Sequence, residues 1–409
     1  MLAMKVALAA SFVSVVVGFC PAPKSLLRTP ERGALPLPSR DNGMPAAAAR
    51  TSIRMASSSP SDGGSDEQST GPFTRKSLLE GVTKAAGVLG AGTFVQKGFV
   101  AGVPYNGSPD LSGKAAVITG GNTGLGKETA VRLAQLGADV TIACRNPHRA
   151  FAALEDIKAQ APGAKVGAMP LDLASLDSVG SFAKRYTSSS DRLDILVNNA
   201  GVMAIPERQA TKDGFEMQFG TNHLGHFRLT SLLMPALLKS PDARVVNVAS
   251  AAHLFASSVE WDDLNAQAPG AYAPWKAYGL SKLSNIYFTK ALQRRVDSKG
   301  AGSITATSLH PGACRTELGR YLFDPSQPAN PLVYPALAAL TLVTRSPKEG
   351  AQTQIACAAD PALGTGSSAG GTYYVGPKIS ELPSELARDP EAAERMWAAS
   401  EKLVGKFSV

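Results

Sequence analysis

The stretch that decides the fold is Thr119-Gly120-Gly121-Asn122-Thr123-Gly124-Leu125-Gly126. It follows a short β-branched run and precedes a helical pattern that we expect to begin near Gly126. Glycine lets the backbone turn sharply, and the first free N–H groups of a helix favour an anion such as a pyrophosphate. The stretch therefore predicts a dinucleotide-binding turn, with contacts from Gly120, Asn122, Thr123, Gly124, Leu125 and Gly126.

Short apolar segments recur along the chain around this turn, separated by segments of helical length. We expect a helix at His148–Ala159 and strands at Ala115–Thr119, Asp139–Ala143, Val166–Leu171, Leu193–Asn198, Arg244–Ala249 and Ile304–Leu309. Strands that alternate with helices indicate βαβ units and a buried parallel sheet. The sequence thus predicts an α/β fold, a single doubly wound Rossmann-type domain with a central parallel sheet, over residues 110–409.

The composition is that of a globular enzyme, with 44% hydrophobic and 18% charged residues. The net charge is +8, but residues 1–109 contain 11 Lys and Arg against six Asp and Glu, which leaves 30 and 27 in the rest. No basic stripe is interleaved with aromatic residues, so we exclude nucleic acid as a partner.

Neither the cysteines nor the histidines are spaced like metal ligands. Cys20, Cys144, Cys314 and Cys357 are far apart, and we expect the last three to be reduced and mostly buried. His223 and His226 are three residues apart without a carboxylate or cysteine partner, so we expect them to pack or to form hydrogen bonds. We predict no metal site.

The first 109 residues predict a largely disordered targeting extension. Residues 1–18 resemble a signal peptide, with Lys5 followed by the apolar run Val6–Val17. Residues 19–72 are rich in Ser, Ala, Pro and Arg, which is typical of a transit peptide, and end in a Ser/Gly-rich part. This two-part order resembles the plastid presequences of algae with secondary plastids, and it predicts a chloroplast location, stromal or membrane-associated. A low-complexity tail is the alternative.

Residues 73–109 contain a second apolar stretch, Leu78–Gly102, interrupted by glycines and by Lys84 and Lys97. We favour an apolar linker or a peripheral helix on a membrane or on the folded domain. The alternative is a thylakoid-transfer signal, because Arg75-Lys76 precedes the stretch.

Tyr278 and Lys282 carry the strongest chemical signal. Their spacing of four places both side chains on one helix face, within a helical pattern that extends to Leu292. A nearby ammonium stabilises a phenolate, so we expect Lys282 to lower the pKa of Tyr278. Ser250 follows an expected strand, at the sheet edge where open α/β folds bind ligands, and its hydroxyl can hold a substrate oxygen.

Arg145 follows the second expected strand, where NAD-preferring proteins place an acidic residue against the ribose 2′-hydroxyl. A guanidinium suits a phosphate instead, so we predict NADP(H) as the cofactor, with Arg145 at the 2′-phosphate and Lys127 as a helper. A solvated arginine is the alternative.

These motifs together resemble the classical short-chain dehydrogenases/reductases over essentially all of residues 110–409. The resemblance implies a proton relay through Asn222, an adenine contact from Asp172 and Leu173, and a nicotinamide contact from Thr316. It also implies that cofactor contacts come from Asn199, Ala200 and Gly201 of Asn198-Asn199-Ala200-Gly201, from Pro311 and Gly312, and from Tyr278 and Lys282.

The block Asn222-His223-Leu224-Gly225-His226-Phe227 and Leu309-His310-Pro311-Gly312 are similar to the branch that contains retinol dehydrogenases and light-dependent protochlorophyllide reductase. The chain keeps Asn198-Asn199-Ala200-Gly201 and lacks a long insertion between Ser250 and Tyr278, which favours the retinol dehydrogenase-like alternative. The resemblance implies reduction of a carbonyl, or oxidation of an alcohol, on an apolar substrate.

Three further expectations stay open. An NADP(H)-binding redox sensor at the plastid import machinery is the alternative to an enzyme. The apolar stretch Pro331–Val343 is either a lid over an apolar substrate or a core helix. A homodimer and peripheral membrane association both agree with the resemblance.

Overall fold

A seven-stranded sheet forms the centre of the protein in a computed structural model that describes residues 104–300, 303–321, 344–376 and 383–409. Every strand pair is parallel, and the order is β3-β2-β1-β4-β5-β6-β7. The strands are β1 (Ala115–Thr119), β2 (Asp139–Cys144), β3 (Val166–Pro170), β4 (Ile195–Asn198), β5 (Ala243–Val248), β6 (Ile304–His310) and β7 (Tyr373–Val375). The order reverses beside β1, so the doubly wound prediction is confirmed.

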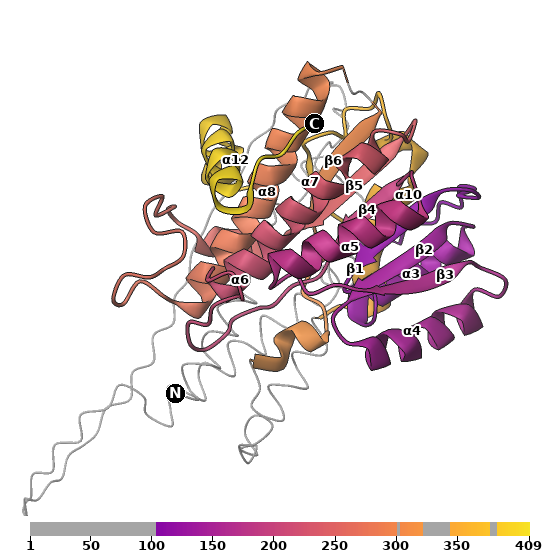
Figure 1. Cartoon of the computed structure of the whole chain (residues 1–409), viewed down its shortest axis with the longest axis horizontal. Coiled ribbons are helices and arrows are strands. Elements are labelled where there is room, and N and C mark those ends of the chain that lie inside the picture. The colour runs from indigo at the N-terminus through magenta and orange to yellow at the C-terminus, as the bar shows by residue number, and fades with distance from the viewer. Residues whose placement is uncertain (1–103, 301–302, 322–343, 377–382) are drawn as a thin grey trace, which may run out of the picture. The chain divides into compact units, whose positions relative to one another are not determined.

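Helices cover both faces of this sheet (Figure 1). One face packs against α3 (Gly124–Gln135), α4 (Pro147–Gln160) and α10 (Pro347–Ala359). The other packs against α5 (Leu176–Ser189), α7 (Gly225–Leu237) and α8 (Pro274–Ser298). Successive strand residues alternate between the two cores: Val117 faces the second, and Ala116 and Ile118 face the first.

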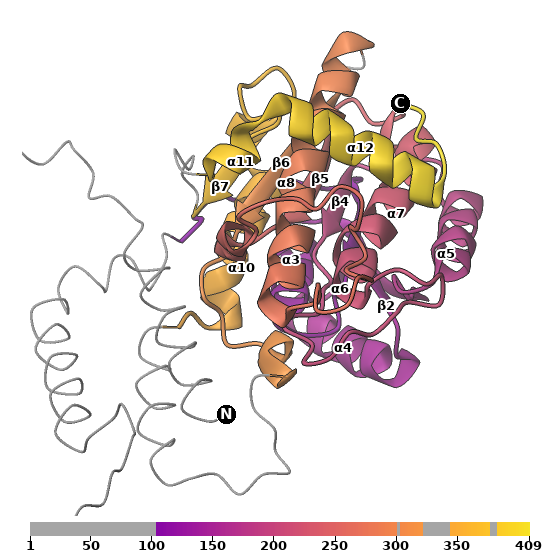
Figure 2. The same ribbon diagram turned by 90° about the vertical axis from the view of Figure 1, so that its left-hand side faces the viewer.

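The C-terminal helix α12 (Pro390–Val404) adds a layer outside α8 (Figure 2). Its Trp397 is buried among Phe227, Phe288 and Phe407, with ring centroids 4.7–5.9 Å apart. A short helix, α11 (Glu385–Arg388), precedes it, and the 3₁₀ turn η5 (Pro361–Leu363) follows α10. The C-terminal segment therefore completes the core on the α8 side.

Several element boundaries differ from those expected. Helix α3 begins at Gly124 because the chain turns already at Thr123, and α8 extends from Pro274 to Ser298 because proline is accepted in a first helical turn. β4 begins at Ile195, two residues later than expected. Asp194 precedes the strand, and its carboxylate accepts a hydrogen bond from the N–H of Ala115 at 2.8 Å. β7 has only three residues and was not among the expected strands.

Residues 104–109, which the sequence assigned to the linker, contact the domain. The N–H of Tyr105 donates to Gln352 Oε1 of α10 at 2.9 Å, and Arg132 of α3 donates to the Gly107 carbonyl at 2.9 Å. The predicted presequence parts, Leu78–Gly102 and Pro331–Val343 lie outside the described residues. Where the chain is described, no helix has both the length and the apolar character of a membrane span.

Candidate active site

The turn between β1 and α3 has the backbone that the glycine pattern predicted. Gly120 and Gly124 have φ values of +65° and +55°. A Cβ added at Gly126 would lie 2.5 Å from Asn199 Nδ2 and 2.5 Å from the Gly120 carbonyl, so only glycine fits there. The cap residue Thr123 forms no side-chain cap hydrogen bond, and the first turn of α3 contains no acidic residue. These features suit a pyrophosphate.

Thr119 ties the turn to the segment that follows β4. Its Oγ1 accepts hydrogen bonds from the N–H groups of Asn199 and Ala200 at 2.9 and 3.0 Å. Asn199 Nδ2 in turn donates to the Thr119 carbonyl at 2.8 Å. A Cβ at Gly120 would lie 3.1 Å from the Ala200 side chain. The predicted cofactor residues of the two segments therefore lie against each other.

Arg145 and Lys127 differ in their surroundings. Arg145 follows β2 directly, is exposed, and forms no hydrogen bond or ion pair with any residue of the described ranges. Asn146 caps α4 by accepting from the N–H of Arg149 at 3.0 Å. Lys127 is paired with Asp156 of α4. Among the described residues the Arg145 guanidinium therefore has no partner, whereas Lys127 is paired with Asp156.

Ser250, Tyr278 and Lys282 come together at the ends of β5 and α8. Ser250 caps the 3₁₀ turn η3 (Ala251–Phe255) by accepting from the Ala252 N–H at 3.1 Å, and its hydroxyl is hydrogen-bonded to Tyr278. Lys282 Nζ lies 5.7 Å from the Tyr278 ring centroid and donates to the Val248 carbonyl at 2.8 Å. All three side chains are buried.

Burial dominates the protonation of this centre. It raises the pKa of Tyr278 above its ordinary value, and the hydrogen bond to Ser250 only partly offsets the rise. The pKa depression that the sequence predicted for Tyr278 is absent because the Lys282 ammonium is bonded to a backbone carbonyl and not to the phenol. Burial also lowers the pKa of Lys282 to about 8. At neutral pH the centre holds a protonated phenol, which can donate to a carbonyl oxygen.

Asn222 lies in the π-helical turn η2 (Gly220–Leu224), between the one-turn helix α6 (Met217–Phe219) and α7. Both amide hydrogens and one lone pair are used: Oδ1 accepts from the Val202 N–H at 2.8 Å, and Nδ2 donates to the Val202 carbonyl at 2.9 Å and to Ser281 Oγ at 3.0 Å. A Cβ at Gly201 would lie 3.1 Å from Asn222 Oδ1 and 3.7 Å from Lys282 Nζ. Asn222 and Lys282 therefore lie around the same backbone position, Gly201.

The segment after β6 lies over the Gly-rich turn. A Cβ at Gly124 would lie 3.2 Å from Thr316 Cγ2, which brings Thr316 to the cofactor turn. Gly312 has φ +90°, and Arg345 donates to the Pro311 carbonyl at 2.9 Å. The 3₁₀ turn η4 (Glu317–Tyr321) follows, and its first residue pairs with Arg149 at 2.6 Å. The predicted residues after β6 are thus placed at the site.

Asp172 and Leu173 follow β3 and approach α7. A Cβ at Gly225 would lie 2.5 Å from the Leu173 carbonyl, so the close contact requires glycine. Asp172 Oδ1 accepts from the Ala174 N–H at 3.1 Å. The pair therefore lies at the carboxyl ends of the strands, as do the other predicted cofactor residues.

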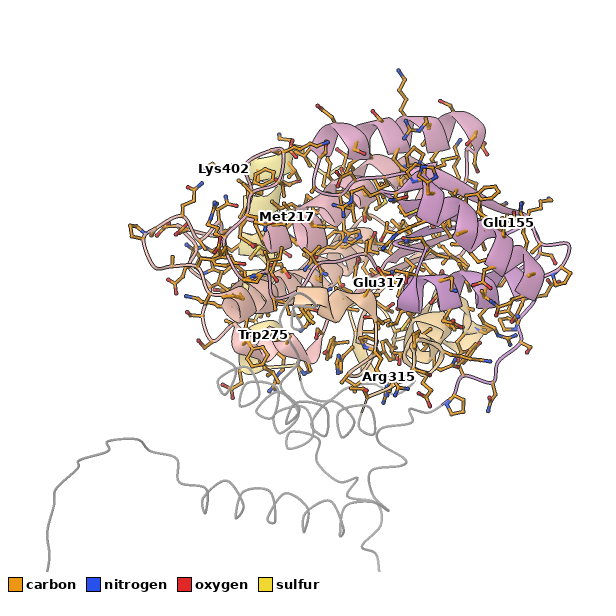
Figure 3. The ribbon with its side chains drawn as sticks, turned by 90° about the horizontal axis from the view of Figure 1, so that it is seen from below. Glu155, Met217, Trp275, Arg315, Glu317 and Lys402 are labelled. Carbon is orange, nitrogen blue, oxygen red and sulfur yellow. The ribbon has the colours of Figure 1, made fainter. Side chains whose placement is uncertain are left out.

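Aromatic side chains stand next to the catalytic tyrosine. The ring centroid of Trp275 is 6.2 Å from that of Tyr278 and 5.5 Å from that of Phe255, and both Trp275 and Phe255 are half-buried. Trp275, Arg315 and Glu317 are visible from the same side of the domain in Figure 3. The catalytic centre therefore borders an apolar surface.

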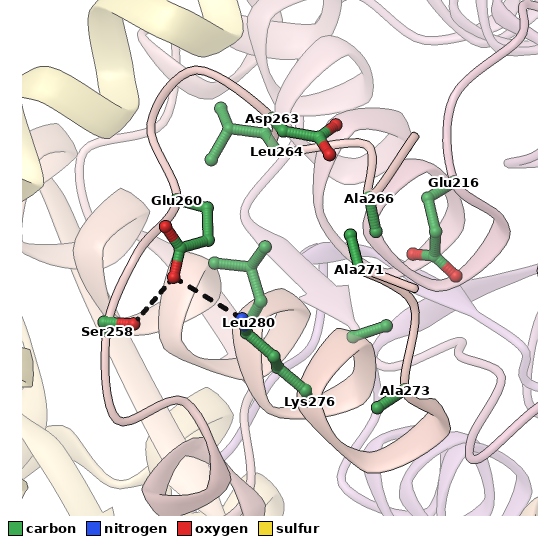
Figure 4. A pocket seen from close by; sticks show the side chains of 11 residues that line it. Glu216, Ser258, Glu260, Asp263, Leu264, Ala266, Ala271, Ala273, Lys276 and Leu280 are labelled. Carbon is green, nitrogen blue, oxygen red and sulfur yellow. Dashed lines mark hydrogen bonds and ion pairs between the residues drawn. The ribbon is translucent and has the colours of Figure 1, made fainter. Parts of the chain in front are cut away.

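A small cavity of about 40 Å³ beside α8 is a separate feature (Figure 4). Leu280 and Lys276 line it together with Glu260, to which Lys276 pairs at 3.5 Å. Leu280 is two residues from Tyr278, roughly 200° around the helix. The cavity consequently lies on the face of α8 away from the catalytic side chains.

Two histidines contact site residues in ways the sequence did not reveal. His253 Nδ1 lies 2.7 Å from the Ser250 carbonyl, and its Nε2 accepts from the Ser384 N–H at 3.2 Å. His226 contacts Thr119 and the Asn222 carbonyl. Its position four residues after Asn222 could have placed it on the same helix face, whereas the sequence holds no signal for the Ser384 contact.

The expectations for His223 and for the three described cysteines are met. His223 Nε2 lies 2.8 Å from Ser400 Oγ, and its ring is buried among Phe219, Phe227 and Phe288. Cys144 and Cys357 are buried free thiols, and Cys314 is a half-buried one. Cys20 lies outside the described residues.

Comparison with known proteins agrees with this fold. The family model described as short chain dehydrogenase matches residues 114–261. The chain is 40% identical to human retinol dehydrogenase 13 over 327 residues, which covers 78% of this chain and 93% of that protein. It is 39% identical to mouse retinol dehydrogenase 12 over 311 residues, 76% of this chain and 92% of that protein.

A crystal structure of an uncharacterized protein from Mycobacterium paratuberculosis is 34% identical, with a TM-score of 0.58, and covers 75% of this chain and 100% of that one. The chain therefore belongs to the short-chain dehydrogenase family of oxidoreductases. Within that family its sequence is retinol dehydrogenase-like.

Proposed function

We propose that this chain is an NADP(H)-dependent oxidoreductase that reduces a carbonyl, or oxidises the corresponding alcohol, on an apolar substrate. The observation that carries the proposal is the buried Ser250–Tyr278–Lys282 centre at the carboxyl edge of the sheet. NADPH, when bound, supplies the hydride for reduction.

The side chains divide the remaining work. The protonated phenol of Tyr278 donates its proton to the carbonyl oxygen, and the Ser250 hydroxyl orients that oxygen. The Lys282 ammonium favours the phenolate that remains, because an opposite charge stabilises it. Asn222, which lies with Lys282 around Gly201, is proposed to relay the replacement proton together with water.

The preference for NADP(H) rests on Arg145. An exposed guanidinium directly after β2, without a partner in the described part of the chain, can form a bidentate contact with a 2′-phosphate, and the capping residue Asn146 that follows it is uncharged. We expect Arg145→Ala to raise the KM for NADPH about tenfold or more and to leave the KM for NADH within about twofold, since one charged hydrogen-bonded contact contributes about 1.5–3 kcal/mol. Equal effects on both cofactors would contradict this assignment.

The preference for an apolar substrate rests on Phe255 and Trp275 beside Tyr278. The test is NADPH oxidation by the full chain with all-trans-retinal, long-chain aldehydes, short polar aldehydes, and protochlorophyllide in light and dark. We expect turnover of retinal or long-chain aldehydes and little turnover of the short polar ones. Turnover of protochlorophyllide alone would replace the proposed substrate class. Tight NADPH binding without turnover of any compound would contradict the enzyme and favour a redox sensor.

We also propose that residues 1–72 direct the chain to a plastid, as their two-part composition suggests. Fused to a fluorescent protein in an alga with a secondary plastid, this segment should carry the label into the plastid, and residues 19–72 alone should leave it outside. Secretion of the first fusion would contradict the proposal.

A further inference from the structure

His226 connects two parts of the site that lie on different elements. Its ring is buried, with Nε2 2.8 Å from Thr119 Oγ1 at the end of β1 and Nδ1 2.9 Å from the Asn222 carbonyl in η2. Thr119 belongs to the cofactor turn, and Asn222 stands beside Lys282. One imidazole thus spans from the cofactor turn to the turn next to the proton-transferring side chains.

The partners of the ring determine its tautomer. A carbonyl only accepts hydrogen bonds, so the ring proton is on Nδ1, facing Asn222. Thr119 Oγ1 already accepts from two backbone N–H groups and has one proton to donate. Two acceptors lie within reach of that proton, His226 Nε2 at 2.8 Å and the Val197 carbonyl at 3.3 Å, and the shorter contact is the one to the unprotonated Nε2. Every polar atom is then satisfied by a neutral ring.

A second proton has no place in this arrangement. On Nε2 it would face Thr119 Oγ1, whose two lone pairs are occupied. Burial lowers the pKa of His226 to about 4, and the nearby Lys282 charge lowers it further, against the hydrogen bond to Asn222. His226 therefore stays neutral over the range in which enzymes of this kind work.

The local helix geometry gives the ring its role. In η2 the Gly225 N–H bonds to the Gly220 carbonyl five residues earlier, which is the wide spacing of a π-turn. Such turns free backbone groups from the regular pattern. A side chain of the next turn that donates a hydrogen bond to the Asn222 carbonyl therefore fixes the direction in which this carbonyl points.

We propose that His226 is a positioning residue that clamps the Asn222 turn to the cofactor turn through Thr119, and thereby sets the surroundings in which Tyr278 donates its proton beside the Lys282 ammonium. The proposal rests on the proposed oxidoreductase function. It concerns a residue that touches neither substrate nor cofactor and acts through Asn222 and Thr119.

Three substitutions separate the two contacts of the ring. The amide of His226→Asn can replace Nδ1 and keep the Asn222 contact, that of His226→Gln can replace Nε2 and keep the Thr119 contact, and His226→Leu removes both. The matched control is His223→Leu, because His223 is equally buried in the preceding turn η2 but bonds to Ser400 of α12. We expect both leucine variants to lower the Tm.

Only the His226 variants should change the chemistry. We expect His226→Leu and His226→Gln to lower kcat about tenfold to a hundredfold, since small misplacements of reacting groups cost that much. The Kd for NADPH should stay within about threefold, and the alkaline limb of the pH–rate profile should move. His226→Asn should recover most of the lost kcat, and His223→Leu should keep the kcat and pH profile of the parent chain.

The inference and the proposed function fail in different ways. If the parent chain reduces no carbonyl, the function fails, and nitrogen-15 NMR of the histidine rings still tests the clamp: His226 must be neutral with its proton on Nδ1 from pH 6 to 9. A proton on Nε2 would overturn the inference. If the parent chain is active, a kcat and pH profile of His226→Leu equal to those of His223→Leu would also overturn the inference.

Discussion

Lys282, to which we assign a role in proton transfer, carries a buried charge that costs stability. Its ammonium is buried and donates a hydrogen bond to the Val248 carbonyl. Burial disfavours the charged form, which is why its pKa falls to about 8. Deprotonation is therefore easier in the folded chain than in the unfolded chain, where an ordinary lysine titrates near 10.4.

The contribution of Lys282 to the free energy of unfolding depends on pH. Between pH 8 and about 10 the unfolded chain binds more protons at Lys282 than the folded chain, so the contribution of Lys282 to the free energy of unfolding rises with pH. We expect the stability of Lys282→Met relative to the parent to be greatest below pH 8 and to decline toward pH 10, with a total change of up to roughly 3 kcal/mol. Urea unfolding at pH 7, 8, 9 and 10 measures this, and a pH-independent difference would contradict it.

Gly126, at the scale of the β1–α3 turn, combines a backbone and a packing requirement. An added methyl group meets Asn199 Nδ2 and the Gly120 carbonyl, each at 2.5 Å. Overpacking of this kind costs about 1–3 kcal/mol. We expect Gly126→Ala to weaken NADPH binding about tenfold or more, because the turn must move away from the cofactor position.

Gly180 of α5 provides the matched control for this prediction. A Cβ added at Gly180 meets no atom within 4 Å, so alanine should stabilise the helix by about 0.5–1 kcal/mol and leave NADPH affinity unchanged. Calorimetric titration with NADPH and thermal unfolding measure both quantities. Equal NADPH affinity in Gly126→Ala and Gly180→Ala would show that the turn does not bind the cofactor as we describe.

The elements also show what the sequence could predict. Six strands were placed within two residues at each end, because buried parallel strands are short apolar runs between turn signals. β7 was missed since a run of three residues carries too little pattern. The π-turn η2 was not predictable from local sequence, because its Asn222 side chain is held by Val202 and Ser281, 20 and 59 residues away.

The candidate site, like the fold, was predictable where local sequence determines it and unpredictable where distant residues do. Ser250, Tyr278 and the Gly-rich turn were recognisable because each lies at a fixed offset from a strand or helix end. The direction of the Tyr278 pKa shift was wrong, since it depends on burial and on the Val248 carbonyl, which takes the Lys282 ammonium. Such partners come from packing over long sequence separations, and no spacing in the chain encodes them.

At the scale of the whole molecule, α12 packs on the outer side of α8 and closes the core there. Trp397 packs on three phenylalanine rings and under the Arg295 guanidinium, 4.0 Å from the ring centroid. We expect Trp397→Ala to lower the free energy of unfolding by about 3–5 kcal/mol, as for other large buried rings. Urea unfolding followed by far-UV circular dichroism measures the change.

Trp261 is the matched control for Trp397. It also stacks under an arginine, Arg395, at 4.5 Å, but it is only half-buried. Trp261→Ala should therefore cost clearly less than Trp397→Ala, about 1 kcal/mol for the stacking plus its smaller buried area. Equal losses for the two variants would contradict the closing role of α12.

Hydride transfer at the Ser250–Tyr278–Lys282 centre is the central claim of the proposed function. The most direct measurement uses the full chain with NADPH deuterated at the transferable position of nicotinamide C4, an apolar aldehyde, and mass spectrometry of the alcohol. The account predicts one deuterium on the carbinol carbon, and a rate in Tyr278→Phe lowered about 10²–10⁴-fold with NADPH binding retained. An alcohol without deuterium, or an undiminished rate in Tyr278→Phe, would contradict it.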